Sequence, residues 1–309
     1  MGKTYDARRL TLSLAAGLAL VLTSVTAQAQ TKTVLTESSD GVPIAVTIGG
    51  KPDGPELLFI HGYMSSSLNW IKQLESELAE THKLVALDMR GHGSSGKPWT
   101  RSSYASTQLF ADDVAAAIDL AELTDVVIVT WSAGGLYALD YVRHYGGEKV
   151  AGIVLSSSVV GLLPAPPPAT PTPEYQARIE RSRSVNLPTI VEWTSGFIDF
   201  MGKDTELPAK EMEMLRTSAM LVPHHVRRFM RDRPLDNTDL VAELDLPLLF
   251  LAGDQHNSFT SGDLAKAAGQ FANAELKTYA GLGSMVNWHA PARFNADVTT
   301  FAAKVQTGH

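Results

Sequence analysis

The fold is decided by one stretch of the sequence, Val126-Val127-Ile128-Val129-Thr130-Trp131-Ser132-Ala133-Gly134-Gly135-Leu136. An apolar, β-branched run typical of a buried strand leads into Ser132, and a helical pattern follows. A serine in this context lies on a tight turn with its Oγ exposed, and the next amides face a developing oxyanion at a helix N-terminus. Small residues after it let the turn pack against its neighbours. The stretch therefore predicts that Ser132 is a nucleophile.

Strand-like and helix-like segments alternate on both sides of this stretch. Apolar runs typical of buried strands occur at residues 42–48, 57–60, 84–87, 126–130, 152–155 and 248–252. Apolar residues recur three and four apart, as in helices, at residues 70–79, 109–120 and 136–145. This order predicts an α/β fold: a mostly parallel, doubly wound sheet covered by helices on both faces.

One segment interrupts the alternation. A proline-rich run at residues 164–173 is followed by helix-like sequence to about residue 235. Proline runs stay extended and act as semi-rigid tethers, so residues 161–239 are predicted to form an inserted helical lid. Residues 30–160 and 240–309 would form the core. Most apolar residues of this segment are expected to form a small core that joins the lid to the sheet, and methionines and aromatics that are not fully packed would also give a hydrophobic binding wall. These apolar residues are Ile190, Trp193, Phe197, Ile198, Phe200, Met201, Met212, Met214, Leu215, Met220, Leu221, Phe229 and Met230.

The N-terminus has the three-part form of a secretory signal peptide. Lys3, Arg8 and Arg9 precede an uncharged stretch over residues 10–25, and Ala27-Gln28-Ala29 gives a small-residue cleavage site. The stretch is short for a bilayer span. We expect residues 1–29 to be removed and the protein to be exported, to the periplasm or outside the cell, with no stable membrane span after cleavage.

Composition narrows the function classes. The chain has 309 residues, a formal net charge of −7 and no cysteine. An acidic chain is a poor match for nucleic-acid phosphates, and the lack of cysteine excludes disulfides, thiolate metal sites and a cysteine nucleophile. Metalloprotease, P-loop and calcium-loop spacings are absent from the sequence. We therefore expect no metal, no cofactor and no nucleic acid; the sequence leaves the oligomeric state open.

Two further motifs follow strands. They are Phe59-Ile60-His61-Gly62-Tyr63-Met64 and Leu87-Asp88-Met89-Arg90-Gly91-His92-Gly93-Ser94-Ser95-Gly96. With these motifs the chain resembles the α/β-hydrolase fold superfamily over roughly residues 40–305, in particular its lid-bearing esterases and cofactor-free haloperoxidases. The resemblance implies that the amides of Tyr63 and Ala133 form an oxyanion hole. Met64 and Trp131 are expected to contact the substrate. The serine motif of the family begins with a glycine, and this chain has Thr130 at that position.

The partners of the serine depart from the family pattern. The family acid lies three residues after the glycine that ends the strand near residues 248–252, and that position holds His256. The family base follows a Gly-x-Gly turn, where this chain has Ser284. The residue five positions later, often glutamate in relatives, is His289. Both partner positions therefore carry other residues.

Three hypotheses remain for the chemistry, because a serine hydroxyl is a weak nucleophile unless an imidazole takes its proton. In the first, His256 is the base, with Ser284 or a water bridging it to the serine. In the second, His289 is the base, and Asp254 or Asp88 orients it. In the third, neither histidine reaches the serine.

The first two hypotheses predict a hydrolase whose substrate is a small apolar ester or a related carbonyl compound. The third predicts a catalytically degenerate protein of the same fold. Such a protein would bind a small apolar ligand or a partner, or catalyse a non-hydrolytic reaction with the oxyanion hole alone.

Overall fold

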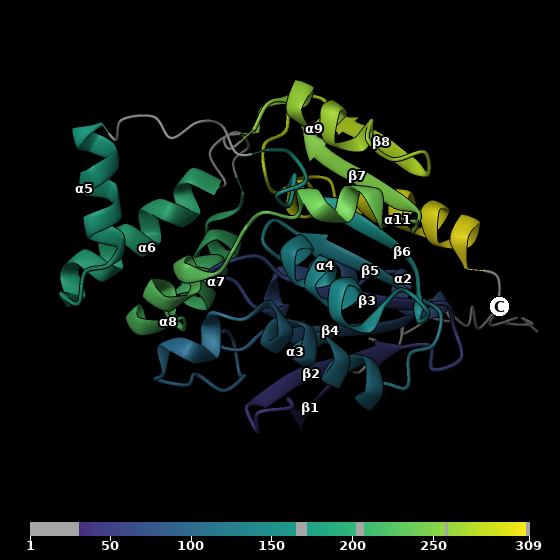
Figure 1. Cartoon of the computed structure of the whole chain (residues 1–309), viewed down its shortest axis with the longest axis horizontal. Helices are drawn as coiled ribbons and strands as arrows, with labels where there is room; N and C mark the ends of the chain where they lie inside the picture. Colours follow the sequence, from purple (N-terminus) through teal and green to yellow (C-terminus); the bar gives the residue numbers. More distant parts are fainter. Residues whose placement is uncertain (1–30, 165–171, 202–206, 257–258, 307–309) are drawn as a thin grey trace, which may run out of the picture.

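A computed structural model describes residues 31–164, 172–201, 207–256 and 259–306. Its centre is an eight-stranded sheet with the order β1-β2-β4-β3-β5-β6-β7-β8 (Figure 1). Strands β1 and β2 pair antiparallel, as do β2 and β4, and every other pair is parallel. The prediction of a mostly parallel sheet is thereby confirmed. The predicted signal peptide lies outside the described residues.

The strands are β1 (Lys32–Glu37), β2 (Pro43–Gly50), β3 (Glu56–Ile60), β4 (Lys83–Asp88), β5 (Val126–Trp131), β6 (Val150–Ser156), β7 (Leu248–Gly253) and β8 (Ala274–Tyr279). The helices beside the sheet are α1 (Ile71–Leu74), α2 (Leu78–Thr81), α3 (Thr107–Leu120), α4 (Gly134–Tyr145), α9 (Ser261–Ala268), α10 (Val286–His289) and α11 (Pro291–Val305).

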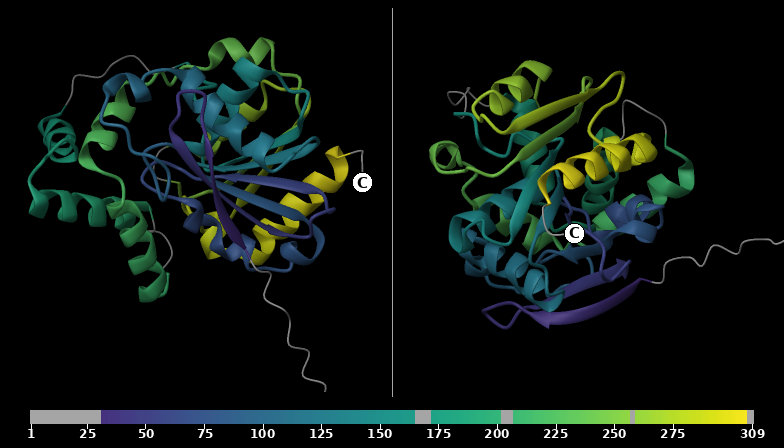
Figure 2. Two further views of the ribbon diagram at one scale, coloured as in Figure 1. Left: turned by 90° about the horizontal axis from the view of Figure 1, so that it is seen from below. Right: turned by 90° about the vertical axis from the view of Figure 1, so that its right-hand side faces the viewer.

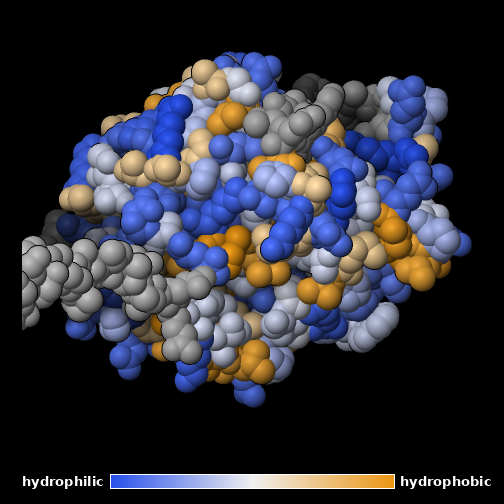
Figure 3. Space-filling model, turned by 180° about the vertical axis from the view of Figure 1, so that it is seen from behind, coloured by the Kyte–Doolittle hydropathy of each residue, from blue (hydrophilic) through white to orange (hydrophobic). Residues whose placement is uncertain are grey.

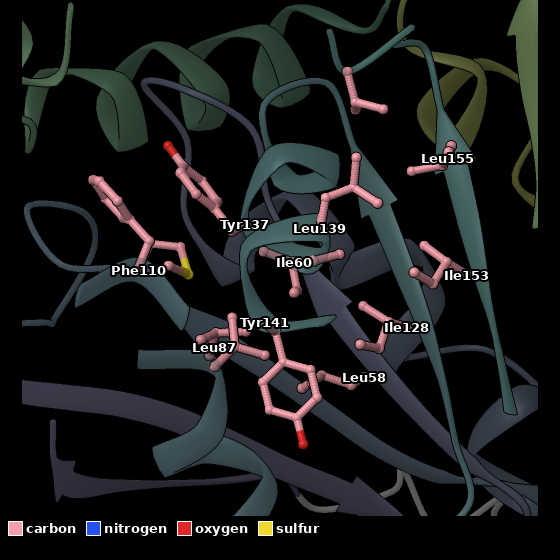
Figure 4. Close-up of a cluster of buried hydrophobic side chains, with 14 of the residues drawn as sticks. Leu58, Ile60, Leu87, Phe110, Ile128, Tyr137, Leu139, Tyr141, Ile153 and Leu155 are labelled. Atoms are coloured by element: carbon pink, nitrogen blue, oxygen red, sulfur yellow. The ribbon is translucent and has the colours of Figure 1, made fainter. Parts of the chain in front are cut away.

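The sheet separates two layers of apolar side chains. One face packs on α3, α4 and α9, with Phe110 and Tyr137 stacked 5.0 Å apart between ring centroids (Figure 4). The other face packs on α1, α2 and α11, where Trp70 and Phe294 are fully buried. Figure 2 shows helices on both sides of the strands. The central strands β3, β5 and β7 are buried along their whole length, as strands covered on both faces should be.

Sequence patterns missed the two edge strands. β1 and β8 alternate between exposed and half-buried residues along most of their length, so they lack the apolar run that marks a central strand. The predicted helix over residues 70–79 is also wrong in its extent, because α1 and α2 are separate short helices. The Ser76 hydroxyl donates to the Gln73 carbonyl and accepts from the Leu78 amide, and such local bonds compete with a continuous helix.

A helical insertion connects β6 to β7. It comprises α5 (Pro173–Ser182), α6 (Leu187–Met201), α7 (Ala209–Met220), α8 (His224–Phe229) and the 3-10 turns η3 (Met230–Asp232) and η4 (Thr238–Ala242). In Figure 1 helices α5 to α8 lie to the left of the sheet. A buried ion pair between Arg233 and Asp140 joins the segment after η3 to α4. The insertion is therefore anchored directly to the helix that follows Ser132.

The outer surface shown in Figure 3 is mostly hydrophilic, with small, separate apolar patches. Scattered apolar residues of this kind are normal on soluble domains. In the described part of the chain, no helix has both the length and the hydropathy needed to cross a bilayer.

Candidate active site

Ser132 occupies a strained turn between β5 and α4. Its φ is 51°, in the left-handed region that side chains other than glycine rarely adopt. The Ser132 amide donates to the Ser156 carbonyl at 2.8 Å, and the Gly135 amide donates back to the Ser132 carbonyl at 3.2 Å. Strain at a single residue persists only where the surroundings determine the conformation, and it is concentrated at functional sites. Ser132 is half-buried and lines a cavity.

Glycines allow the serine turn to pack closely against the loop after β3. A Cβ atom on Gly134 would lie 2.2 Å from the Ile60 carbonyl oxygen, and one on Gly62 would lie 2.7 Å from the Trp131 ring. Real Cβ atoms do not come this close, so both positions require glycine. This contact brings the amides of Tyr63 and Ala133 to the same side of the sheet as Ser132.

These two amides have the properties of an oxyanion hole. Ala133 is the N-cap residue of α4, where backbone amides have no partner within the helix. Among the described residues, neither the Tyr63 nor the Ala133 amide donates a hydrogen bond to a protein acceptor. A negatively charged oxygen beside Ser132 could accept from both, with added stabilisation from the helix dipole.

Two buried histidines hold in place the loop after β3 that carries Tyr63, the candidate oxyanion loop. His61 Nε2 accepts from the Met89 amide at 3.1 Å, and His92 Nε2 accepts from the Met64 amide at 3.3 Å. The Nδ1 atoms of both rings face carbonyl oxygens, of Gly62 and Arg90 respectively, so the proton is on Nδ1 in each. Burial lowers the pKa of both imidazoles, and that of His92 lies well below its usual value. Both histidines are neutral structural groups.

The cavity in front of Ser132 has a volume of about 1060 Å³. Its walls come from the segments that follow β5, β6 and β7 and from the helical insertion. Apolar residues form much of the lining, among them Val159, Leu163, Ile179, Trp193, Phe197, Phe200, Met201, Leu235 and Phe259. The cavity is large enough for a small organic molecule and lies where ligands bind in α/β sheets, beyond the carboxyl ends of the strands.

The structure brings His256, but not His289 or Ser284, to the same cavity as Ser132. The His256 ring stacks on Phe259 at 3.8 Å between centroids, and both side chains line the cavity. Ser284 is fully buried, and its carbonyl accepts from the Trp131 indole N–H at 2.8 Å. His289 lies at the end of α10, and neither it nor Ser284 is among the lining residues.

The two acids considered as partners of His289 have other contacts. The Asp254 carboxylate accepts from the Gly281 amide at 2.8 Å and so joins the loops after β7 and β8. The Asp88 carboxylate accepts from the amides of Ser67 and Ser94 at 2.6 and 2.7 Å. Both carboxylates therefore hold loops together.

Met64 and Trp131 differ from their predicted role as substrate contacts. Both side chains are buried, with 0% and 3% exposure, and neither lines the cavity. The Met64 backbone has a φ of 57°, and its side chain packs in the apolar layer that also contains Trp70. The Trp131 ring lies against Gly62, which fixes it inside the turn. The cavity wall contains Tyr63 together with Trp193 and Phe197, two of the lid residues from which the sequence predicts an apolar wall.

Sequence reasoning also missed the arginines of the cavity. Arg178 and Arg181 on α5 and Arg231 on η3 line it together with Ser157. The spacing of three between Arg178 and Arg181 puts them on one helix face, but it does not show which way that face points. Within the described ranges, no group of three or more histidine or acidic side chains is arranged to hold a metal.

Comparison with known proteins agrees with this geometry. The family model described as "Alpha/beta hydrolase family" matches residues 57–297, and the chain belongs to this family of enzymes. A non-heme chloroperoxidase from Streptomyces lividans is 28% identical over 275 residues, which are 85% of this chain and 97% of that protein.

Solved structures of esterases share the fold of this chain. A Burkholderia cenocepacia protein provisionally assigned as an aryl esterase has a TM-score of 0.80 and 29% identity, covering 89% of this chain and 99% of that one. The esterase RhEst1 from Rhodococcus sp. ECU1013 has a TM-score of 0.77 at 23% identity, covering 88% and 99%, which shows the shared fold alone.

The buried, neutral state of His92 predicts a pH dependence of stability. Because its pKa is lowered in the folded protein, the unfolded chain binds more protons below about pH 6.5, and this part of the stability is lost as the pH falls. We expect His92→Gln to make the fall in the free energy of unfolding between pH 7 and pH 5 shallower, by at most about 1.4 kcal/mol per pH unit. Urea unfolding at a series of pH values measures this slope.

His144→Gln at the exposed end of α4 is the control, and it should change the slope less because that side chain stays in contact with water. An identical slope in the parent and in His92→Gln would show that His92 does not titrate differently on folding.

Proposed function

We propose that the protein hydrolyses a carboxylic ester or a related carbonyl compound through Ser132. The observation that carries the proposal is the strained Ser132 turn opening on a cavity beside the two amides of Tyr63 and Ala133. In acyl transfer, donors aimed at the position of the developing oxyanion contribute a large part of the rate enhancement.

We assign the general base to His256. It is the one histidine among the described cavity-lining residues, so it is the imidazole best placed to take the Ser132 proton, directly or through one water. Ser132 Oγ would attack the carbonyl carbon while the amides of Tyr63 and Ala133 bind the oxygen. His256 would return the proton to the leaving alcohol, and water would then hydrolyse the acyl-enzyme.

The walls of the cavity indicate the substrate class. Val159, Trp193, Phe197 and Phe259 present apolar surface to whatever reaches Ser132. Apolar pockets with a few polar groups bind small organic molecules and fix their orientation through those polar groups. The proposed substrate is therefore a small molecule with an apolar part, and the helical insertion acts as the lid over it.

One observation favours the alternative of binding without turnover. The Ser284 hydroxyl, at the position where relatives have their base, is buried with no hydrogen-bond partner among the described residues. A chain that had lost its base could keep the cavity and the oxyanion hole. The two substitutions below separate the alternatives.

Ser132→Ala is expected to abolish both ester hydrolysis and labelling by a fluorophosphonate, because both reactions need the same activated oxygen. The measurements are the release of p-nitrophenol from short p-nitrophenyl esters and mass spectrometry of the labelled peptide. Ser158→Ala is the matched control, since Ser158 lines the same cavity and should keep both reactions. Equal hydrolysis by the parent and Ser132→Ala, or none by the parent, would refute the serine-hydrolase proposal.

His256→Asn is expected to lower kcat by about 10²- to 10⁴-fold with little change in KM, because general-base catalysis acts in the chemical step. Steady-state kinetics on the same esters measure the two constants separately. His289→Asn is the control and should leave kcat unchanged. Loss of kcat in His289→Asn with retention in His256→Asn would transfer the role of base to His289.

We also propose that the protein is exported, with cleavage after Ala29. The support is the charged, apolar and small-residue pattern of the first 29 residues. Expression of the full chain in a bacterial host should give an exported product that begins at Gln30. Intact mass and N-terminal sequencing of the exported fraction test this; a product that keeps Met1 and stays inside the cell would contradict it.

A further inference from the structure

Three arginines from the helical insertion give the cavity a cationic wall. Arg178 and Arg181 lie three residues apart on α5, and Arg231 lies on η3. The two acidic residues in the lining are Glu192 and Asp236. The lining thus has an excess of positive charge, although the chain as a whole has a net charge of −7. A positively charged cleft attracts anionic ligands even when the protein as a whole is negatively charged.

Two of these arginines, Arg181 and Arg231, have no carboxylate partner among the described residues. Asp236 is engaged elsewhere, because its Oδ1 accepts from the Thr238 amide at 2.9 Å and from the Thr238 hydroxyl at 2.8 Å. Guanidinium groups with free donors are well suited to a carboxylate, which they can bind in a bidentate manner.

Arg231 lies near the side chain of Tyr63, which belongs to the loop after β3. Its positive charge acts on the Tyr63 hydroxyl and opposes the rise in that group's pKa caused by burial, and the hydroxyl donates to the Arg227 carbonyl at 3.2 Å. The Tyr63 side chain therefore separates the guanidinium from the Tyr63 amide that is assigned to the oxyanion hole. A ligand that reaches both must have a reactive carbonyl and an anionic group separated by several methylenes.

A fourth arginine adds to the positive charge near the cavity. The Arg227 side chain is 1% exposed, donates to the Thr194 hydroxyl at 2.9 Å and packs over the ring of Trp193, a lining residue. Among the described residues it has no carboxylate partner, and its Nε has no hydrogen-bond partner. Buried charges are normally paired, so an anion on the other side of Trp193 would lower the cost of burying this one.

We propose that the ligand of this cavity is an ester whose far end carries a carboxylate or a similar compact anion. The reacting carbonyl lies at Ser132, the apolar chain lies along Trp193 and Phe197, and the anionic end is bound by Arg231 and Arg181. The position of the carbonyl rests on the proposed function. The anionic end rests on the arginines alone.

The test compares monomethyl adipate, whose far end is a carboxylate, with dimethyl adipate, whose far end is an uncharged methyl ester. Calorimetric titration of the Ser132→Ala protein at pH 7.5 measures binding without turnover. We expect the monoester to bind about tenfold more tightly, and this preference to fall as salt is raised. The double variant Arg181→Gln/Arg231→Gln, made in the same background, should remove the preference and leave binding of the diester unchanged.

Arg183→Gln/Arg228→Gln is the matched control, because it removes two exposed arginines of the insertion that do not line the cavity. Equal binding of the two esters, tighter binding of the diester, no binding of either, or an equal loss of preference in both double variants would overturn the proposal. Hydrolysis by the parent without a preference for the monoester would refute the anion site but leave the proposed function intact. A preference for the monoester without any hydrolysis by the parent would support the anion site but refute the proposed function.

Discussion

The close approach of two backbone turns is the constraint on which the rest of the site depends. The turn at Ser132 and the loop after β3 meet where only glycine fits, at Gly62 and Gly134. Ser132 has a φ of 51° in this turn, and Gly62, the residue before Tyr63, lies so close that a Cβ on it would be 3.0 Å from the Ser132 Cβ. Elsewhere in the protein such strain would only reduce stability. In the proposed reaction it would position the nucleophile and two donors before any substrate arrives, which would lower the cost of organising them during the reaction.

The constraint extends beyond the two turns. His61 and His92 bond to the backbone of each other's loops and keep the chain after β3 beside the chain after β4. The Arg90 side chain then donates two hydrogen bonds of 2.8 and 2.7 Å to the Asp113 carboxylate and fixes the second loop to helix α3. The helical insertion completes the site from the other side, because its residues supply most of the cavity wall and all of its arginines.

The sequence predicts the central part of this arrangement well and the walls of the cavity only in part, because it indicates the apolar lid residues but not the arginines. The apolar strands and the small residues after Ser132 carry strong local patterns, and six predicted strands match observed ones. Met64 and Trp131 neighbour the catalytic groups in sequence, yet tertiary packing turns both side chains into the core. The cavity arginines lie on helices whose orientation depends on how the whole insertion docks. Periodicity shows that a helix has a polar face, but it does not show what that face meets.

The central claim is that Ser132 and the amides of Tyr63 and Ala133 act together on a tetrahedral centre. A crystal structure of the protein after reaction with a p-nitrophenyl alkylphosphonate tests it most directly, because the adduct mimics the charged intermediate. We expect a covalent bond from Ser132 Oγ to phosphorus, with the phosphoryl oxygen within hydrogen-bond distance of both amides. An adduct on another residue, or a phosphoryl oxygen directed away from the two amides, would contradict it.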